Sequence, residues 1–464
     1  MKKTLLSGLI GLFAAQPTLA MDLVETYEKA ISYDSGIASA RAQLAAQQAG
    51  IDISRSSLLP QIGLFGELAD NELDDNGQDI SYRESSYGIQ LTQPLFRAED
   101  WFRYDGSKFQ SKAAQAQYNL AQQQLMLDVA TAYFNVLRAE DGLTTALATE
   151  AAIQRQYEQA QERFDVGLIA ITEVYEARAS YDAVKSQRIA AESELDIARE
   201  RLARLTGEYT KDLDNLTQAF PLMRPDPMDP SAWEQTAVAR NWQIQSAIYE
   251  LNTNEANLKT AKSGHLPTLD LSARWAKSDV SDLDAPAQPQ QLPGQSSQAG
   301  DGTERQIALT LNVPLYMGGG TQAGVRQQRS LVEVAQQSLA TVRRDVRVNA
   351  RSLFLTVNTN IESASALEQT IISRRSALDA TRAGYEVGTR NIVEVLDAER
   401  AYYVALRDYA NARYDYIINT FNLKLAAGIL SPRDLAGLNE WLSPTAPGIE
   451  ALANETKIID DPTR

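Results

Sequence analysis

Cysteine is absent from this 464-residue chain, and histidine occurs only once, as His265. Without cysteine the chain has no disulfide, no cysteine nucleophile and no N-terminal cysteine to carry a lipid. The common histidine-rich metal sites are excluded as well. We expect no catalytic residue, no metal and no cofactor, and a role for His265 at a junction between elements. Pairs of carboxylates are plentiful, as on any solvated helix, so they alone do not exclude a hydrolase.

Two further absences concern charge and long apolar runs. Acidic residues outnumber basic ones by 60 to 44, a net charge of -16, so the chain would repel nucleic acid. Residues 1–20 have a basic start, an apolar stretch and the small-residue sequence Thr18-Leu19-Ala20, which predicts a signal peptide. No later run approaches the roughly 20 apolar residues of a membrane-spanning helix. We therefore expect an exported protein without a helical anchor.

Proline is missing from two long stretches, between Pro94 and Pro221 and between Pro314 and Pro432. These stretches are rich in Ala, Gln, Leu, Arg and Glu, which favour helices. We predict one long helix over Asp105–Arg163 and another over Thr321–Ala383. With their flanking turns, each would be roughly 100 Å long at 1.5 Å per residue. Leu120, Leu127 and Phe134 recur every seven residues, which indicates coiled-coil packing.

The chain also repeats itself once. Arg163–Gly207 aligns with Gly384–Gly428 without a gap, and Val24–Pro60 aligns with Ser231–Pro267. Two long copies favour a pseudo-symmetric unit over a solenoid. We divide the chain into a signal peptide (1–20), a first structural repeat (21–220), a linker (221–230), a second repeat (231–430), and a C-terminal equatorial segment with a flexible tail (431–464).

Four segments change from helical periodicity to strict alternation of apolar and polar residues. They are Gln61–Ala69, Tyr87–Thr92, Thr268–Trp275 and Gln306–Val313. Polar loops are expected between the members of each pair, at Asp70–Ser85 and Asp279–Glu304. A proline lies at each of the four strand boundaries: Pro60, Pro94, Pro267 and Pro314. Alternation over about ten residues is typical of transmembrane barrel strands. A soluble, half-buried sheet gives the same pattern, but it would have to be inserted between very long helices.

Four strands cannot close a barrel, and open edges are not tolerated in lipid. Two copies would give eight strands and a filled interior, whereas three would give twelve and a lumen. Two pairs of shorter helices are also predicted, and the two helices of each pair, stacked end to end, would match one long helix in length. The pairs are Glu173–Leu205 with Ser231–Lys262, and Asn391–Ala427 with Asp22–Ser56. The predicted fold is an α+β membrane protein with four antiparallel strands per subunit. Three subunits would form a 12-stranded barrel continued by a long α-helical coiled-coil barrel in the periplasm.

Several motifs resemble the TolC family of outer-membrane channels, and the resemblance extends from Asp22 to about Trp441. They are Thr131–Leu137, Arg163–Leu168, Gly264–Leu271, Gly384–Asp397 and Ala412–Asn419. The resemblance implies a homotrimer in the outer membrane that extends into the periplasm. It also implies a periplasmic adaptor (membrane fusion) protein and an inner-membrane efflux pump or ABC transporter as partners. The cargo would be small toxic compounds or secreted polypeptides.

Glu394 and Asp397 lie three residues apart and so share one helix face. In a trimer they would place six carboxylates around one constriction, a ring that favours cations and raises some of the carboxyl pKa values. Asn391 and Glu394 also have the spacing of a helix N-cap and its partner, and spacing alone does not separate the two interpretations. The resemblance implies the selectivity ring. The family usually has Asp at the first position, so Glu394 is a longer variant.

The resemblance assigns Thr172, Glu173, Tyr385 and Arg390 to links that hold the helix tips closed. Arg390 would form an ion pair with Glu173 of a neighbouring subunit, although Glu173 replaces the family's Asp. The two turns, Val166, Gly167 and Leu168, and Val387, Gly388 and Thr389, are candidate adaptor contacts; a glycine at a helix end is more often only a cap. The competing class is a soluble periplasmic coiled-coil structural or adaptor protein.

Overall fold

The computed structural model describes residues 20–75, 78–284 and 301–446. The predicted signal peptide, apart from Ala20, and the tail after position 446 lie outside the described residues. The described chain forms two compact units. The first unit contains residues up to 38, 121–241 and from 346 onward; the second contains residues 39–120 and 242–345. Both predicted repeats contribute segments to each unit, and the division of the chain into repeats stays a prediction.

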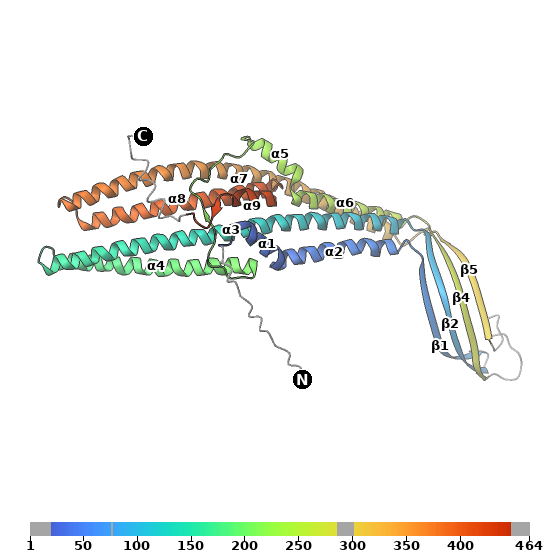
Figure 1. Ribbon diagram of the computed structural model, residues 1–464. Helices are drawn as coiled ribbons and strands as arrows, with labels where there is room; N and C mark the ends of the chain where they lie inside the picture. The colour runs from blue at the N-terminus through green and yellow to red at the C-terminus, as the bar shows by residue number, and fades with distance from the viewer. Residues whose placement is uncertain (1–19, 76–77, 285–300, 447–464) are drawn as a thin grey trace, which may run out of the picture. The chain divides into compact units, whose positions relative to one another are not determined.

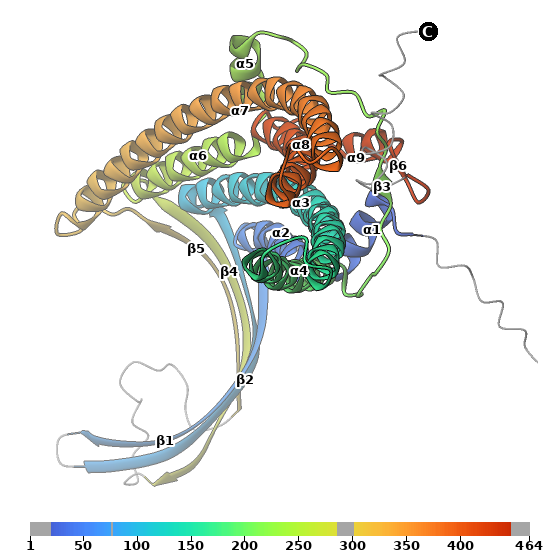
Figure 2. The ribbon, with the colours of Figure 1, turned by 90° about the vertical axis from the view of Figure 1, so that its left-hand side faces the viewer.

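The second unit contains a four-stranded antiparallel sheet. Its strands are β1 (Gln61–Asp75), β2 (Gln78–Phe96), β4 (Thr268–Asp284) and β5 (Asp301–Asn312). They lie in the order β1-β2-β4-β5, and the sheet curls along its length (Figures 1 and 2). Strands β2 and β4 each have a neighbour on both sides, whereas β1 and β5 are the two edges.

The pairing register aligns the apolar residues of all four strands on one face of the sheet, in agreement with the predicted alternation. Ile62 pairs with Leu91, Leu91 with Ala273, and Ala273 with Ile307, so one face is apolar in every strand. Many large side chains of this face are exposed in the single chain: Ile62, Leu64, Leu68, Ile89, Trp275, Ile307, Leu309 and Leu311. The opposite face carries polar rows such as Gln90, Arg274 and Gln306. The sheet thus presents an uncovered apolar face, the reverse of what a sheet in water requires.

The strands are longer than the sequence pattern predicted. Asp70–Ser85 and Asp279–Glu304 were expected to be loops, but β1 and β2 pair as far as Asp75 with Gln78, β4 continues to Asp284, and β5 begins at Asp301. Residues 76–77 and 285–300 of these expected loops lie outside the described residues. Alternation detects only the part of a strand that has an apolar face, whereas the backbone ladder continues through polar residues. Pro94 lies inside β2 rather than at its boundary, beside a shift of register between Pro94 and Phe96.

Helices flank this sheet in the chain. The second unit includes most of α2 (Ser35–Ser56), all of α6 (Trp242–Ser263) and the first parts of α3 (Ala98–Asp165) and α7 (Gly320–Glu386). Gly318 and Gly319 have φ of 62° and 80°, so they ease the turn from β5 into α7. Among the residues that the structure describes, no helix is both long and apolar enough to cross a membrane.

The first unit is helical, with α3 beside α4 (Ile171–Thr206) and α7 beside α8 (Ile392–Ala426), as Figures 1 and 2 show. It also contains α1 (Leu23–Tyr33), α5 (Pro230–Arg240), α9 (Pro432–Asn439) and the short strand pair β3 (Asn215–Leu216) and β6 (Leu442–Ser443). Its core includes Tyr133, Phe134, Leu406, Ile417 and Leu423, all almost fully buried. Leu127 and Phe134 of the predicted seven-residue pattern are buried there, whereas Leu120, which belongs to the second unit, is half-buried.

Two helices predicted as continuous are interrupted. Asp22–Ser56 divides into α1 and α2 at Asp34, whose carboxylate accepts a hydrogen bond from the Ile37 amide (2.9 Å). Ser231–Lys262 divides into α5 and α6 at Asn241, whose side-chain amide donates to the Ala426 carbonyl (2.9 Å). The Asp34 bond is local, of the kind that Asp forms outside the helical conformation, whereas the Asn241 bond is to a residue distant in the chain. Helix propensity alone reveals neither break.

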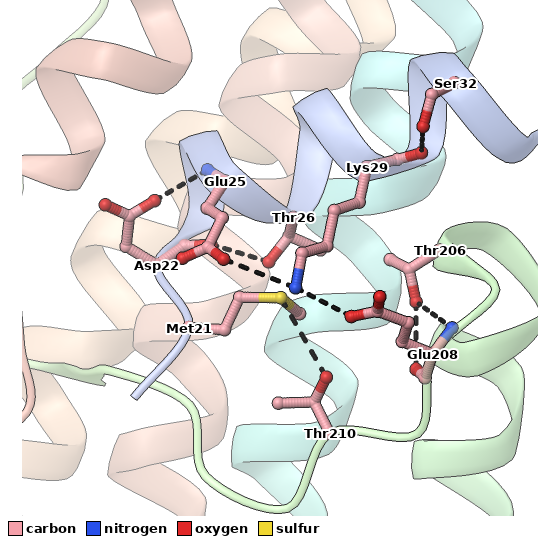
Figure 3. Close-up of polar contacts among 9 residues, drawn as sticks. All are labelled: Met21, Asp22, Glu25, Thr26, Lys29, Ser32, Thr206, Glu208 and Thr210. Carbon is pink, nitrogen blue, oxygen red and sulfur yellow. Dashed lines mark hydrogen bonds and ion pairs between the residues drawn. The ribbon is translucent and has the colours of Figure 1, made fainter. Parts of the chain in front are cut away.

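Polar contacts attach α1 to the segment that follows α4 (Figure 3). The Lys29 ammonium donates to the Glu208 carboxylate at 2.8 Å, which raises the pKa of Lys29 above its ordinary value. The Asp22 carboxylate caps α1 by accepting from the Glu25 amide (2.7 Å), and the Met21 amide donates to the Asp212 carbonyl (3.0 Å). The start of the described chain is therefore held within the first unit.

Gly428 and Gly388 form a matched pair for testing backbone packing. Both have positive φ, 69° and 78°, but a Cβ at Gly428 would lie 2.4 Å from the Arg240 carbonyl oxygen, whereas one at Gly388 meets open space. Gly388→Ala should cost about 1 kcal/mol for its left-handed backbone. Gly428→Ala should cost a further ~1–3 kcal/mol for overpacking. Chemical unfolding of the purified proteins measures both, and equal destabilisation would contradict the close approach.

Candidate functional site

Two helix–turn–helix tips lie in the first unit, one between α3 and α4 and one between α7 and α8. At the first, the Leu168 amide donates to the Arg163 carbonyl (2.8 Å) and the Gly167 amide donates to the Phe164 carbonyl (2.8 Å). At the second, Thr389 and Gly388 make the same two bonds to Gly384 (2.9 Å) and Tyr385 (3.0 Å). This is the Schellman end of a helix, which needs a left-handed residue, and both glycines supply it with φ of 76° and 78°.

The tips carry apolar side chains into solvent. Val166 is 70% exposed, Leu168 is 72% exposed and Val387 is 74% exposed. A Cβ added to either glycine would meet no atom within 4 Å. The glycines therefore satisfy the cap interpretation, and the same turns leave an uncovered apolar surface. That an adaptor contacts them stays a prediction.

The two predicted ring residues lie at the start of α8. The Asn391 side chain accepts from the Glu394 amide (2.9 Å), so the N-cap predicted from their spacing is present. The Glu394 side chain accepts from Arg390 of the same chain (2.6 Å). This hydrogen bond to Arg390 lowers the pKa of Glu394, the opposite of the rise expected from crowding in a trimer. Asp397 is exposed, one turn farther along the helix.

The predicted closing links involve both tips. The Tyr385 hydroxyl accepts a hydrogen bond from the Arg163 guanidinium (2.6 Å), whose Cζ lies 4.9 Å from the centre of the tyrosine ring. Arg163 thus joins the ends of α3 and α7 within one chain. Thr172 and Glu173 are exposed in the first turn of α4. A bond from Arg390 to Glu173 would be made between subunits and stays a prediction.

A buried carboxylate behind the tips was not predicted. Glu399 of α8 is 6% exposed and accepts from Arg382 of α7 (2.8 Å) and from Gln156 of α3 (3.3 Å). It therefore connects three helices. A signal for it was present in the sequence, because Glu399 falls four residues after the buried Val395 and three before the buried Tyr402, on an apolar helix face. Arg163 has no comparable signal.

A cavity of about 580 Å³ lies between α3, α4 and α8 in the same unit. Its lining includes the basic side chains of Arg138, Arg400 and Arg407 and the carboxylate of Glu194. Among the described residues, no group of three or more His, Asp or Glu side chains is arranged to hold a metal ion. The residues that the sequence singled out lie at the tips and do not line this cavity.

The sequence matches the family model described as "Outer membrane efflux protein" over residues 26–208 and 233–429. It is 36% identical to the outer membrane protein TolC of Escherichia coli strain K12, over 98% of this chain and 92% of that protein. The alkaline protease secretion protein AprF of Pseudomonas aeruginosa is 26% identical, over 93% of this chain and 89% of AprF. The CmeC outer membrane channel of Campylobacter jejuni has the same fold, with a TM-score of 0.76 at 16% identity, over 100% of this chain and 98% of CmeC.

These three are an outer membrane protein, a secretion protein and a channel, and none is an enzyme. The fold class predicted from the sequence, antiparallel strands joined to very long helices, is confirmed by the likeness to CmeC. The resemblance to the TolC family is confirmed as well.

Glu399 offers a test of the packing behind the tips. Glu399→Gln keeps the shape of the side chain but removes the charge that pairs with Arg382, and we expect a loss of about 1–3 kcal/mol in unfolding free energy. The control is Asp379→Asn. The Asp379 side chain is 62% exposed and pairs with Arg375, four residues earlier on the same helix. This substitution should cost less than about 0.5 kcal/mol. Thermal unfolding in detergent measures both, and a Glu399→Gln effect no larger than the control's would be inconsistent with a buried link.

Proposed function

This chain belongs to the outer membrane efflux protein family, and from that premise we propose that it is a passive exit duct in the outer membrane, built by three copies. It carries no catalytic machinery of its own. The energy for transport comes from inner-membrane partners. The observation that supports this most directly is the sheet of the second unit, which has an uncovered apolar face and two unpaired edges.

Both features of the sheet are explained by a closed barrel in lipid. An apolar face is stable against hydrocarbon, and a row of unpaired N–H and C=O groups is not. Pairing β5 of one copy with β1 of the next leaves no free edge. Three copies give twelve strands, enough for a water-filled lumen, whereas eight strands are filled by their own side chains.

The helix tips are the proposed constriction. In a threefold assembly Glu394 and Asp397 come from three chains and form a ring of carboxylates that prefers cations. Thr172, Glu173, Tyr385 and Arg390 hold neighbouring tips together, and opening follows when these links break. The exposed side chains of Val166, Leu168 and Val387, with Gly167, Gly388 and Thr389, form the surface for a periplasmic adaptor.

The partners and cargo follow from the relatives. A periplasmic adaptor connects the duct to an inner-membrane efflux pump or ABC transporter. The family is described by efflux and the relative AprF by the secretion of a protease, so we propose small toxic compounds and secreted polypeptides as cargo. A deletion strain tested against a panel of toxic compounds and for protein export separates the two classes.

The competing proposal is a soluble periplasmic coiled-coil structural or adaptor protein, which the long helices alone would also fit. Its sheet would need to be covered in water by another layer. We expect the protein instead to sediment with the outer membrane, to need detergent for extraction, and to purify as a trimer. Release by osmotic shock as a water-soluble monomer, without ion current in a planar bilayer, would overturn the duct.

The closing links predict the effect of two substitutions on conductance. Arg390→Ala and Tyr385→Phe each remove one link per subunit, and the loss of a partly exposed link of about 0.5–1 kcal/mol shifts the balance from closed to open about two- to fivefold for each subunit. Single-channel recordings in planar bilayers measure the change. Tyr157→Phe, which removes a tyrosine hydroxyl elsewhere on α3, is the control and should leave conductance unchanged. Conductance equal to wild type in both tip variants would contradict the proposed latch.

A further inference from the structure

Arg390 has a partner in its own chain. Its Nη1 donates to Oε2 of Glu394 at 2.6 Å, and the two side chains are 60% and 37% exposed. Arg390 lies in the turn, directly before the N-cap Asn391, and its side chain reaches forward to Glu394 in the first turn of α8. The same guanidinium is the one that the proposed latch requires at a neighbouring subunit.

We propose that Arg390 exchanges between Glu394 of its own chain and the latch acceptor Glu173 of the adjacent chain, so that the ring and the latch compete for one guanidinium. This inference rests on the proposed function, because it needs both the ring and the latch. It adds a regulatory role to Glu394. This carboxylate lines the constriction and also determines how often the latch is engaged.

The turn orients Arg390 for this exchange. The Arg390 amide donates to the Gly384 carbonyl (3.2 Å), and a Cβ at Gly384 would lie 2.8 Å from Cγ of Arg390. The stem of the arginine thus lies against a position where only glycine leaves room. Its exposed guanidinium remains free to swing between acceptors, because an exposed pair of this kind is only weakly favoured over water.

The length of Glu394 matters for the same reason. The glutamate reaches the Arg390 guanidinium in the turn before the helix, whereas an aspartate at this position is one methylene shorter. Asp397 is seven residues from Arg390, two turns along α8, and the structure has the guanidinium on Glu394. The two ring residues are therefore unequal. Glu394 is neutralised by its neighbour, and Asp397 carries the charge that a passing ion meets.

The two states of the exchange have opposite consequences. With Arg390 on Glu394, half of the ring carboxylates are neutralised and the latch lacks its donor. With Arg390 on Glu173, the latch is closed and the Glu394 side chains repel one another across the ring. The lowered pKa of Glu394 in the single chain is consistent with the first state. Tyr385 can act in either state, because its hydroxyl oxygen accepts from Arg163 and its proton is left to donate.

The exchange is tested by conductance and by the ratio of potassium to chloride permeability, both measured on the reconstituted full-length trimer. Glu394→Gln keeps the width of the constriction and releases Arg390 to the latch. It should lower conductance about twofold, the bias that a weak, exposed ion pair provides. It should lower the permeability ratio less than Asp397→Asn does, because Arg390 already neutralises Glu394 for part of the time. Asp397→Asn should lower the ratio clearly.

Arg390→Ala should raise both quantities, because it opens the latch and exposes the Glu394 charge. Adding Glu394→Gln to Arg390→Ala should return the permeability ratio toward wild type while conductance stays high. The control is Glu192→Gln on α4. It breaks the Arg188–Glu192 ion pair (2.8 Å), in which an arginine also precedes a glutamate by four residues. It should change neither quantity.

Two results are decisive. If Glu394→Gln leaves conductance unchanged and lowers the permeability ratio as much as Asp397→Asn does, the exchange is wrong although the duct and its ring stand. If the wild-type protein passes no current, the proposed function fails and the exchange fails with it.

Discussion

Backbone hydrogen bonding at the sheet edges is the constraint on which the rest of this molecule depends. Strands β2 and β4 are paired on both sides, and β1 and β5 on one side only. In water such an edge is solvated, but the apolar face excludes water from the same segment. Within hydrocarbon each unpaired group costs several kcal/mol. The apolar face of the sheet is stable against lipid, and in lipid the edge strands must be paired. The chain therefore cannot satisfy the backbone hydrogen bonds of β1 and β5 without further copies.

The helical unit meets a different requirement. Helices rich in alanine pack closely in many registers, and apolar contact alone does not select one. Buried polar contacts provide the selection. Tyr414 donates to Asp141 (2.7 Å) between α8 and α3, and Glu399 joins α8 to α7 and α3. Shifting one helix against another by a turn would leave these groups buried without partners, which is costly in a dry interior.

Most of the fold could be predicted because its elements carry strong local signals. The prolines and the helix-forming composition bounded α3 and α7 to within a few residues of their ends, apart from the seven N-terminal residues of α3. Alternation located all four strands but not their polar ends, since the ladder does not depend on side-chain polarity. The breaks at Asp34 and Asn241 depend on bonds to Ile37 and to the distant Ala426, and spacing does not report those.

The candidate site was predictable in its residue types and less so in its partners. The cap of Glu394 by Asn391 followed from a three-residue spacing. The partner of Tyr385 did not, because Arg163 lies 222 residues away in the chain. Arg390 illustrates a further difficulty. The resemblance pointed to Glu173 of another chain as its acceptor, whereas in the single chain it donates to Glu394, because a sequence gives the reach of an arginine but not its choice among acceptors.

The turns at the tips contain two kinds of position, which differ in how freely they can be substituted. Val166, Leu168 and Val387 touch little of their own chain, so replacing them disturbs hardly any packing. The glycines between them are fixed by backbone conformation alone. A lineage of such proteins is thus free to alter a few apolar side chains at the tips, while the helices behind them keep their packing.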